Sequence, residues 1–318
     1  MKTTLLDYLR CSLCQHALAL TETPNPSEII TQGVLRCTGC GHEFAVENGI
    51  PNMLAPQLPR YTEKMREASG WVALSKAHGW YEASVEIDLA LPDVVEKLGW
   101  DPVVSSSWVG TAHSFHDMLA RFVRPGLRVL EIGAAKSWAG RYFTEKGCTY
   151  TGCDLMADPQ IGLGRAHFFR EQSQRYYEVV QADAEALPFA DNTFDLVFAV
   201  AALHHALDLP QMVGEMARVV RQGGIVASLS EGVRSFRAGS EAAQQATEKA
   251  YGINEHVYTL WHYYAAFWRH RLWVTKIYQA ADDQSSPKRT ALVGWLKTMV
   301  VLGYLHDYDG VSIYSYKF

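Results

Sequence analysis

Residues 128–154, RVLEIGAAKSWAGRYFTEKGCTYTGCD, contain the pattern that decides the fold. The stretch opens with a short apolar segment, 128–132, which predicts a buried strand. Residues 137–146 then place large side chains on one helical face, and Gly147 ends the predicted helix. A second apolar segment, 149–154, predicts another strand. A strand, a helix and a strand in this order indicate a parallel pair joined by a helical crossover.

The same alternation continues along the chain. Apolar periodicity predicts a helix over 209–221, and Gly223-Gly224 predicts a turn after it. Further strands are predicted at 178–181, 194–200, 225–229, 271–280 and 311–318. Nearly continuous apolar strands separated by helices are typical of a parallel sheet that is covered on both faces. The sequence therefore predicts an α/β, Rossmann-like fold.

Three residues follow the first three strands at positions where such sheets bind ligands. Gly133 ends the first strand, and a glycine there lets the backbone approach a ligand closely. Asp154 ends the second strand, where a carboxylate can accept both hydroxyls of a ribose. Asp183 follows the third strand, where a carboxylate can accept an adenine amino group. Each acidic residue alone is more often a loop charge or a helix cap, but the ordered set indicates a nucleoside site.

Residues 127–231 resemble the class I S-adenosylmethionine-dependent methyltransferases, close to the subgroup that includes the ubiquinone and menaquinone biosynthesis enzymes. The segments that carry the resemblance follow strands or begin helices: VLEIG (129–133), GCD (152–154), ADAEALPF (182–189), DNTFDLV (191–197), ALHH (202–205) and EMARVVRQGG (215–224). The resemblance implies a seven-stranded, mostly parallel sheet with a reversed last hairpin.

The resemblance also implies S-adenosylmethionine (SAM) as the cofactor and assigns residues to it. Gly133 is expected beside the methionine moiety, Asp154 at the ribose, and Asp183 with the backbone of Ala184 at adenine. The rest of the expected cofactor set is Glu131, Ala134, Ala135, Leu155 and Ala199.

The loop after the first strand departs from the family pattern. Ala135 and Ser137 stand where the family usually has glycines. The serine can cap a helix, and Trp138 can close over the cofactor. Weakened cofactor binding at this loop would instead indicate a non-catalytic protein. A nicotinamide dehydrogenase is disfavoured, because a pyrophosphate needs the missing glycines.

Two pairs of cysteines near the N-terminus indicate a metal site. Cys11 and Cys14 form one C-x-x-C pair, and Cys37 and Cys40 form the other. Four thiolates complete the closed tetrahedron of a structural zinc site. Disulfides and free core thiols are the alternatives, and the absence of a secretory signal disfavours disulfides. A redox C-x-x-C is disfavoured because two pairs are matched. Cys148 and Cys153 are interpreted as core thiols.

Residues 9–54 resemble the Trm112-type zinc ribbon, including the ending NGIPNML (48–54). In that family such ribbons assist a methyltransferase, either in trans or fused to it. We therefore expect a zinc ribbon over 1–54, a linker with a helical cap over 55–126, and a SAM-binding methyltransferase domain over 127–318. Within that domain, helical insertions are expected at about 238–270 and 281–307.

The residues after the fourth strand are candidates for the reaction itself. His204 and His205 lie where a methyl acceptor should approach, and a general base is one role for them. The alternative is that one histidine shapes the pocket and the other packs beneath the loop. Tyr251, His256 and Tyr258 are candidates for substrate binding, although aromatic residues at helical spacing more often pack in a core.

Charge separates the candidate acceptors. The chain carries a formal net charge of -5, and residues 1–54 hold few firm cations, which disfavours a nucleic-acid partner without excluding it. We therefore favour a small-molecule acceptor, such as a sugar, a quinone or a natural-product intermediate. An rRNA or tRNA methyltransferase and a non-catalytic SAM-binding partner are the alternatives. No segment is long and apolar enough to span a bilayer, so a cytoplasmic protein without a membrane partner is expected. The sequence does not indicate an oligomeric state.

Overall fold

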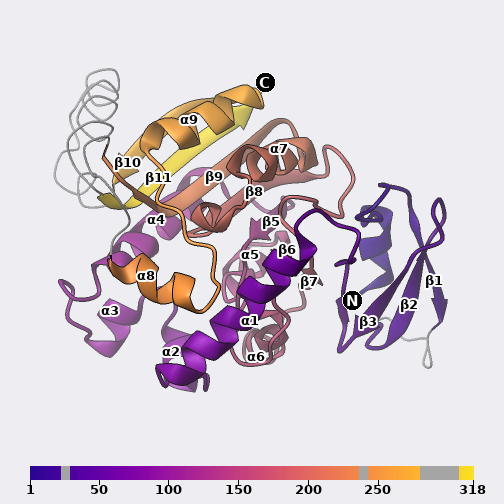
Figure 1. Cartoon of the computed structure of the whole chain (residues 1–318), viewed down its shortest axis with the longest axis horizontal. Coiled ribbons are helices and arrows are strands. Elements are labelled where there is room, and N and C mark those ends of the chain that lie inside the picture. The colour runs from indigo at the N-terminus through magenta and orange to yellow at the C-terminus, as the bar shows by residue number, and fades with distance from the viewer. Residues whose placement is uncertain (23–28, 236–242, 280–307) are drawn as a thin grey trace.

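The computed structural model describes residues 1–22, 29–235, 243–279 and 308–318. The expected insertion at 281–307 and the first residues of the one at 238–270 lie outside the described residues. A seven-stranded sheet forms the centre of the molecule, with the order β10-β11-β9-β8-β5-β6-β7 (Figure 1). The strands are β5 (Arg128–Ile132), β6 (Thr149–Asp154), β7 (Glu178–Gln181), β8 (Phe194–Val200), β9 (Val220–Val233), β10 (Leu272–Gln279) and β11 (Tyr308–Lys317).

Strand directions confirm the predicted fold. Neighbouring strands from β7 to β9 run parallel, whereas β11 runs antiparallel to both β9 and β10. The sheet is therefore Rossmann-like and mostly parallel, with the reversed last hairpin that the resemblance implies. Among the described residues, no helix is long and apolar enough to cross a membrane.

Successive residues of the central strands pack on opposite faces of the sheet. In β5, Leu130 joins one buried cluster with the helices α7 and α9, whereas Val129 joins a second cluster with α4, α5 and α6. This alternation is the two-residue period of a strand that is buried on both sides. The helices around the sheet are α4 (Ser106–Phe122), α5 (Gly140–Glu145), α6 (Ala166–Ser173), α7 (Leu209–Val219), α8 (Ala243–Ala250) and α9 (Leu260–Arg269).

Two elements differ from their predicted bounds. The helix expected from residue 137 begins only at Gly140, because Ala135 and Ser137 have φ angles of 42° and 56°, outside the helical range. The side chain of Ser137 does not cap this helix, whose first flanking residue is Ala139. Strand β9 begins at Val220, so Gly223-Gly224 lies within the strand rather than in a turn before it.

The N-terminal segment forms a separate antiparallel sheet that docks on the β7 edge of the large one (Figure 1). Its strands are β1 (Leu18–Glu22), β2 (Gly33–Cys37), β3 (Glu43–Glu47) and β4 (Ile50–Pro51). The Met53 amide donates to the Gln181 carbonyl over 2.8 Å, and the Arg10 amide donates to the Pro188 carbonyl over 2.8 Å. Apolar residues of the two sheets also share one buried cluster. The small sheet is therefore packed firmly against the loop that follows β7.

Helices α1 (Tyr61–Ala77), α2 (Val85–Ala90) and α3 (Val94–Leu98) connect the two sheets along the chain. Asp88 of α2 is fully buried and binds both Lys136 and Arg165, with N–O distances of 2.8 Å each. These ion pairs hold α2 against the loops that follow β5 and β6. Helix α1 contributes the side chain of Lys64 to the loop after β7, as described below.

Candidate functional site

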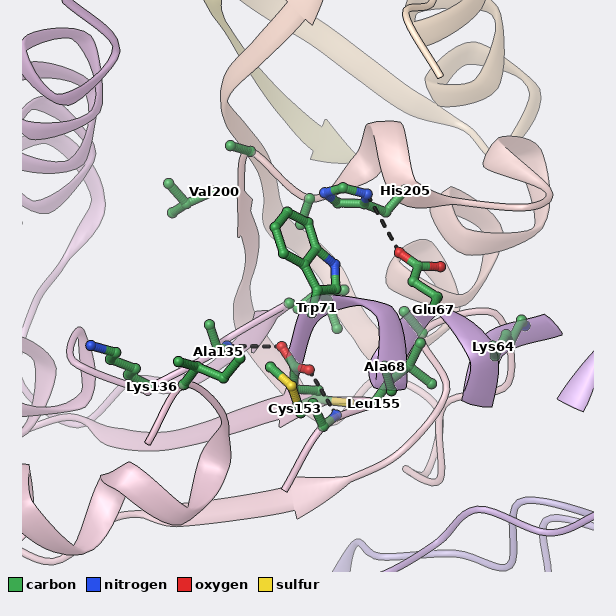
Figure 2. Close-up of a pocket in the computed structure, with 18 of the residues that line it drawn as sticks. Lys64, Glu67, Ala68, Trp71, Ala135, Lys136, Cys153, Leu155, Val200 and His205 are labelled. Carbon is green, nitrogen blue, oxygen red and sulfur yellow. Dashed lines mark hydrogen bonds and ion pairs between the residues drawn. The ribbon is translucent and has the colours of Figure 1, made fainter. Parts of the chain in front are cut away.

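A cavity of about 470 Å³ opens at the carboxyl ends of β5, β6, β7 and β8 (Figure 2). Its floor is formed by the residues that directly follow these strands, and helix α1 covers it from the other side. Parallel α/β sheets bind ligands at this edge. The cavity has the size range of a small-molecule site.

The loop after β5 brings the backbone close to the cavity. Gly133 has a φ angle of +67°, and a Cβ atom there would lie 2.6 Å from the Cβ of Ala202. A glycine is therefore required by both backbone conformation and space. The amide of Ala135 donates to Asp154 Oδ2 over 2.8 Å, and the amide of Met156 donates to Asp154 Oδ1 over 2.9 Å. Two backbone donors thus fix the Asp154 carboxylate, although burial raises its pKa.

The loop after β7 holds the second acidic residue of the predicted set. Lys64 of α1 donates to Asp183 over 2.5 Å and to Glu185 over 3.1 Å. The amide of Glu185 donates to the other oxygen of Asp183 over 2.8 Å. Lys64 and Asp183 are almost fully buried, so their charges neutralise each other inside the protein.

The structure brings most of the expected cofactor residues to one cavity and leaves three beneath it. Those that line the cavity are Gly133, Ala135, Asp154, Leu155, Asp183 and Ala184. Glu131, Ala134 and Ala199 are buried outside the lining. The side chain of Glu131 accepts a hydrogen bond from the Tyr150 hydroxyl, and burial raises its pKa to about 8. The amide of Ala134 donates to the Cys153 carbonyl, and Ala199 packs within β8.

Of the two predicted catalytic histidines, only His205 lines the cavity. Its Nδ1 lies 2.7 Å from the Asn254 carbonyl, so Nδ1 carries the proton and Nε2 keeps a free lone pair. Burial, together with the charge of His204, lowers the pKa of His205 to about 3. His205 is therefore neutral at physiological pH.

His204 lies behind its neighbour and is held by a buried carboxylate. Its Nδ1 is 2.8 Å from Oε2 of Glu231, and the other oxygen of that carboxylate, Oε1, accepts the amides of Ala202 and Leu203 over 3.0 Å each. Burial lowers the pKa of His204, but the hydrogen bond and charge of Glu231 outweigh burial and raise it to about 8. Glu231 therefore anchors the turn that carries both histidines.

The three predicted substrate residues lie outside the lining of this cavity. The His256 amide donates to the His204 carbonyl over 3.1 Å, and the Tyr258 hydroxyl donates to the Ala206 carbonyl over 3.1 Å. Tyr251 borders a second cavity of about 570 Å³, formed with residues of α1 and the segment after α8. Segment 251–258 thus supports the histidine turn from behind.

Sequence reasoning missed the side chains that α1 contributes to the cavity, which are Lys64, Glu67 and Trp71. Their spacing of three and four residues places them on one helical face, which is the signal that could have found them. Glu67 Oε1 lies 3.4 Å from His205 Nδ1, and Figure 2 shows its carboxylate turned toward that ring. Burial, followed by the charges of Asp154 and Glu255, raises the pKa of Glu67 to about 8.

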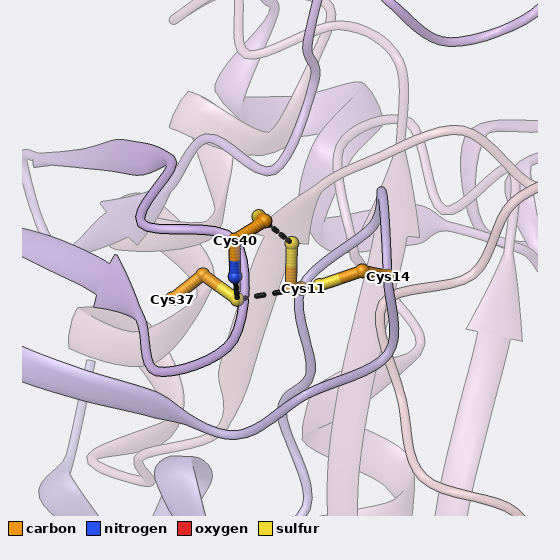
Figure 3. A group of neighbouring side chains, drawn as sticks. All are labelled: Cys11, Cys14, Cys37 and Cys40. Atoms are coloured by element: carbon orange, nitrogen blue, oxygen red, sulfur yellow. Dashed lines mark hydrogen bonds between the residues drawn. The ribbon is translucent and has the colours of Figure 1, made fainter.

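The four predicted metal ligands converge in the N-terminal sheet (Figure 3). The Sγ atoms of Cys11 and Cys40 are 3.7 Å apart, and those of Cys14 and Cys37 are 3.4 Å apart. These distances are too long for a disulfide bond. Cys148 and Cys153 are buried and lie outside this cluster, as core thiols should.

Two segments of the chain match known protein families. Residues 130–228 match the methyltransferase domain family. Residues 2–49 match the Trm112p-like protein family. The first matched segment begins in β5 and ends in β9, so it contains every strand end that contributes to the cavity.

Individual relatives of the methyltransferase domain agree with this match. The sterol 24-C-methyltransferase erg6 of Schizosaccharomyces pombe is 29% identical over 158 residues, 46% of this chain and 41% of that protein. The malonyl-acyl-carrier-protein O-methyltransferase of Enterobacter lignolyticus is 38% identical over 100 residues, 31% of this chain and 37% of that protein. The chain thus spans less than half the length of these relatives.

A solved structure of a geranyl diphosphate methyltransferase, in complex with GPP and sinefungin, has the same fold. It superposes with a TM-score of 0.52 at 14% identity, covering 81% of this chain and all of that one (100%). The cavity described above therefore lies at the strand-end loops of a fold that this solved methyltransferase shares.

Proposed function

We propose that this protein transfers a methyl group from SAM to a small-molecule acceptor. The observation that carries the proposal is the convergence of Gly133, Asp154 and Asp183 on one cavity. SAM supplies a methyl group already activated by a sulfonium, so the protein contributes chiefly alignment of the acceptor. The methyltransferase activities of the named relatives support this class of reaction.

Within the cavity we assign the cofactor to the side of Asp154 and Asp183. Asp154 would hold the ribose, and the backbone of Ala184 with Asp183 would hold adenine. The Asp154 carboxylate fits a ribose, because it accepts two backbone amides and still has lone pairs that can accept hydrogen bonds from the ribose hydroxyls. His205 then faces the acceptor as a neutral hydrogen-bond acceptor, and His204 positions it. The predicted role of a histidine as the base, and the quinone-methyltransferase subgroup, stay predictions.

Calorimetry with S-adenosylhomocysteine (SAH) tests this assignment. Asp154→Asn should weaken SAH binding by about tenfold or more, because an amide replaces one of two acceptors with a donor. Asp191→Asn is the matched control, because Asp191 is exposed and pairs with Arg218 far from the cavity. Folded wild-type protein that takes up no SAH would refute the proposed function.

We also propose that the four cysteines bind a structural zinc ion. Tetrahedral zinc with Zn–S bonds of about 2.3 Å separates its sulfurs by about 3.8 Å, close to the distances between these Sγ atoms. The amides of Gly39 and Cys40 lie 3.3 and 3.4 Å from Cys37 Sγ, so both can donate to a metal-ligating sulfur. Reduced thiolates also agree with the predicted cytoplasmic location.

A further inference from the structure

The acceptor end of the cavity, defined here as Glu67, Trp71, Trp80 and His205, combines an acidic group with aromatic walls. Only 8% of the Glu67 side chain is exposed. Its carboxylate faces His205, and a second carboxylate, from Glu255, lies 3.3 Å from the same Nδ1 of His205. Two carboxylates thus meet around one neutral imidazole.

The aromatic rings of the acceptor end stand at steep angles to one another. The Trp71 and Trp80 rings lie 6.4 Å apart between centroids with an interplanar angle of 62°. The Trp71 and His205 rings lie 5.5 Å apart at 82°. These are edge-to-face contacts between the rings, so the three rings form one continuous aromatic wall, and tryptophan faces attract cations through their quadrupole.

The cationic side chains of the cavity are already neutralised. Among the described lining residues, the only lysines or arginines are Lys64 and Lys136. Lys64 binds Asp183 and Glu185, and Lys136 binds Asp88 over 2.8 Å. A carboxylate or diphosphate acceptor would therefore find both of these lysines already paired with carboxylates, and its charge would be buried without a counter-ion from them.

We propose that the methyl acceptor is a protonated amine with an apolar ring, whose ammonium group binds at Glu67 beside the aromatic wall of Trp71 and Trp80. This inference rests on the proposed methyltransferase function and narrows its substrate class. An ammonium group fits each observation, because it gives the buried carboxylate a counter-ion and lies against indole faces.

The same arrangement provides a route for the proton. Because the pKa of Glu67 is about 8, its carboxyl group is mainly protonated at neutral pH, and binding of the ammonium group displaces that proton to water. The ammonium group then gives one proton to the Glu67 carboxylate, which leaves a neutral amine. The amine nitrogen forms the new N–C bond as the S–C bond of the sulfonium breaks. SAH leaves, and the positive charge moves to the methylated nitrogen. Glu67 keeps its proton when the product departs, which restores the resting carboxyl group. The pKa of Glu67, about 8, suits this role better than that of His205, about 3.

Three probes of one shape test the proposal: phenethylamine, phenethyl alcohol and hydrocinnamate. They share a phenyl ring and a two-carbon spacer but end in an ammonium, a hydroxyl and a carboxylate. Binding is measured by calorimetry with the protein saturated in SAH. We expect phenethylamine to bind about tenfold more tightly than phenethyl alcohol, and hydrocinnamate to bind most weakly.

A charge-removing variant assigns the preference to Glu67. Glu67→Gln should abolish the advantage of phenethylamine over phenethyl alcohol while SAH still binds. Glu63→Gln is the matched control, because Glu63 lies on the same helix but is exposed. It should keep the wild-type preference.

The outcomes separate this inference from the function on which it rests. If SAH binds but phenethylamine has no advantage, whether the probes bind equally or none binds, the amine assignment is overturned and the methyltransferase proposal survives. A preference for hydrocinnamate would also overturn it. If folded protein does not bind SAH, the proposed function itself fails.

Discussion

The cofactor end of the cavity, formed by Gly133, Asp154, Asp183 and Ala184, differs from the acceptor end in how charge is balanced. At the cofactor end, Lys64 neutralises Asp183 and backbone amides hold Asp154. At the acceptor end, the Glu67 carboxylate faces a neutral imidazole, and burial raises its pKa to about 8. The protein thus supplies a lysine or backbone donors to the acidic groups of one end and sets a carboxyl group against a neutral ring at the other.

Removing the metal from the N-terminal sheet should have the largest effect, and it should fall on the cofactor end. The amide of Arg10 donates to the Pro188 carbonyl, and the amide of Ala190 donates to the Tyr8 carbonyl over 2.9 Å, so the segment that carries the four cysteines braces the loop that contains Asp183. Structural zinc contributes about 10–16 kcal/mol in isolated fingers. We expect chelation to release one zinc and weaken SAH binding by more than about tenfold.

Metal analysis and SAH calorimetry on the same chelated sample check this expectation, and added zinc should restore binding. Cys148→Ala is the control. Cys148 is buried away from the cysteine cluster, so this variant protein should retain the metal. Unchanged SAH affinity after complete zinc loss would show that the ribbon does not support the cofactor end.

The next largest effect is expected from the buried ion pair of the cofactor end. Lys64→Met leaves Asp183 buried without its partner, which should lower the free energy of unfolding by about 3–5 kcal/mol. Adding Asp183→Asn to that variant should recover part of the loss. Urea unfolding gives both values. Lys97→Met, at an exposed pair with Asp93, should change stability by less than about 1 kcal/mol. Equal losses of unfolding free energy in Lys64→Met and Lys97→Met would show that the buried ion pair matters no more than the pair with Asp93.

The two ends also differ in how well the sequence predicts them. Gly133, Asp154 and Asp183 follow consecutive strands, so a local pattern places them at one edge of the sheet. Glu67 and Trp71 come from a helix far away in the chain. Their shared helical face was readable, but no local rule tells which edge of a sheet a helix will cross. The acceptor end therefore depends on tertiary packing that the sequence does not reveal.

Strand and helix bounds show the same limit. The apolar core strands were predicted almost residue by residue, because burial on both faces leaves a strong signal. Gly223-Gly224 suggested a turn. Strand β9 runs through these glycines, but its pairing with β8 jumps from Val220 to Ile225, and Gly223 has a φ angle of +68°. The aromatic residues at 251–258 suggested a substrate pocket; Tyr258 bonds the histidine turn, whereas Tyr251 borders the second cavity. Long-range contacts decide both places, and local propensity does not report them.

A pH dependence should distinguish the histidine turn from the cofactor end. The pKa of His204 rises from 6.5 to about 8 on folding, because the hydrogen bond and charge of Glu231 outweigh the burial that opposes them. The stabilisation, about 2 kcal/mol, is fully present below pH 6.5 and is lost as the pH rises through 8. The pKa of Glu231 is lowered, so its contribution is present above its ordinary value and is lost in acid.

Unfolding free energies at about pH 6 and about pH 9 measure this contribution. Glu67 and Glu131, whose pKa values are also raised to about 8, contribute to the slope between these pH values in every variant. The wild type should therefore lose about 2 kcal/mol more than Glu231→Gln between the two pH values. Equal losses in the wild type and in Glu231→Gln would contradict the assignment to the His204–Glu231 pair.

The smallest effect is expected at Ala135, where the cofactor end departs from the family pattern. Its φ angle of 42° lies in the left-handed region, which costs a residue with a Cβ about 1–2 kcal/mol. Glycine at this position would avoid that cost, but it loses more conformational entropy on folding than alanine does. Ala135→Gly should therefore stabilise the protein by about 0.5–1 kcal/mol. Ala134→Gly, one residue earlier with a negative φ, should instead destabilise it by a similar amount. If SAH affinity stays constant in Ala135→Gly while stability rises, the alanine strains the loop without weakening the cofactor end. If affinity rises as well, the missing glycine limits cofactor binding.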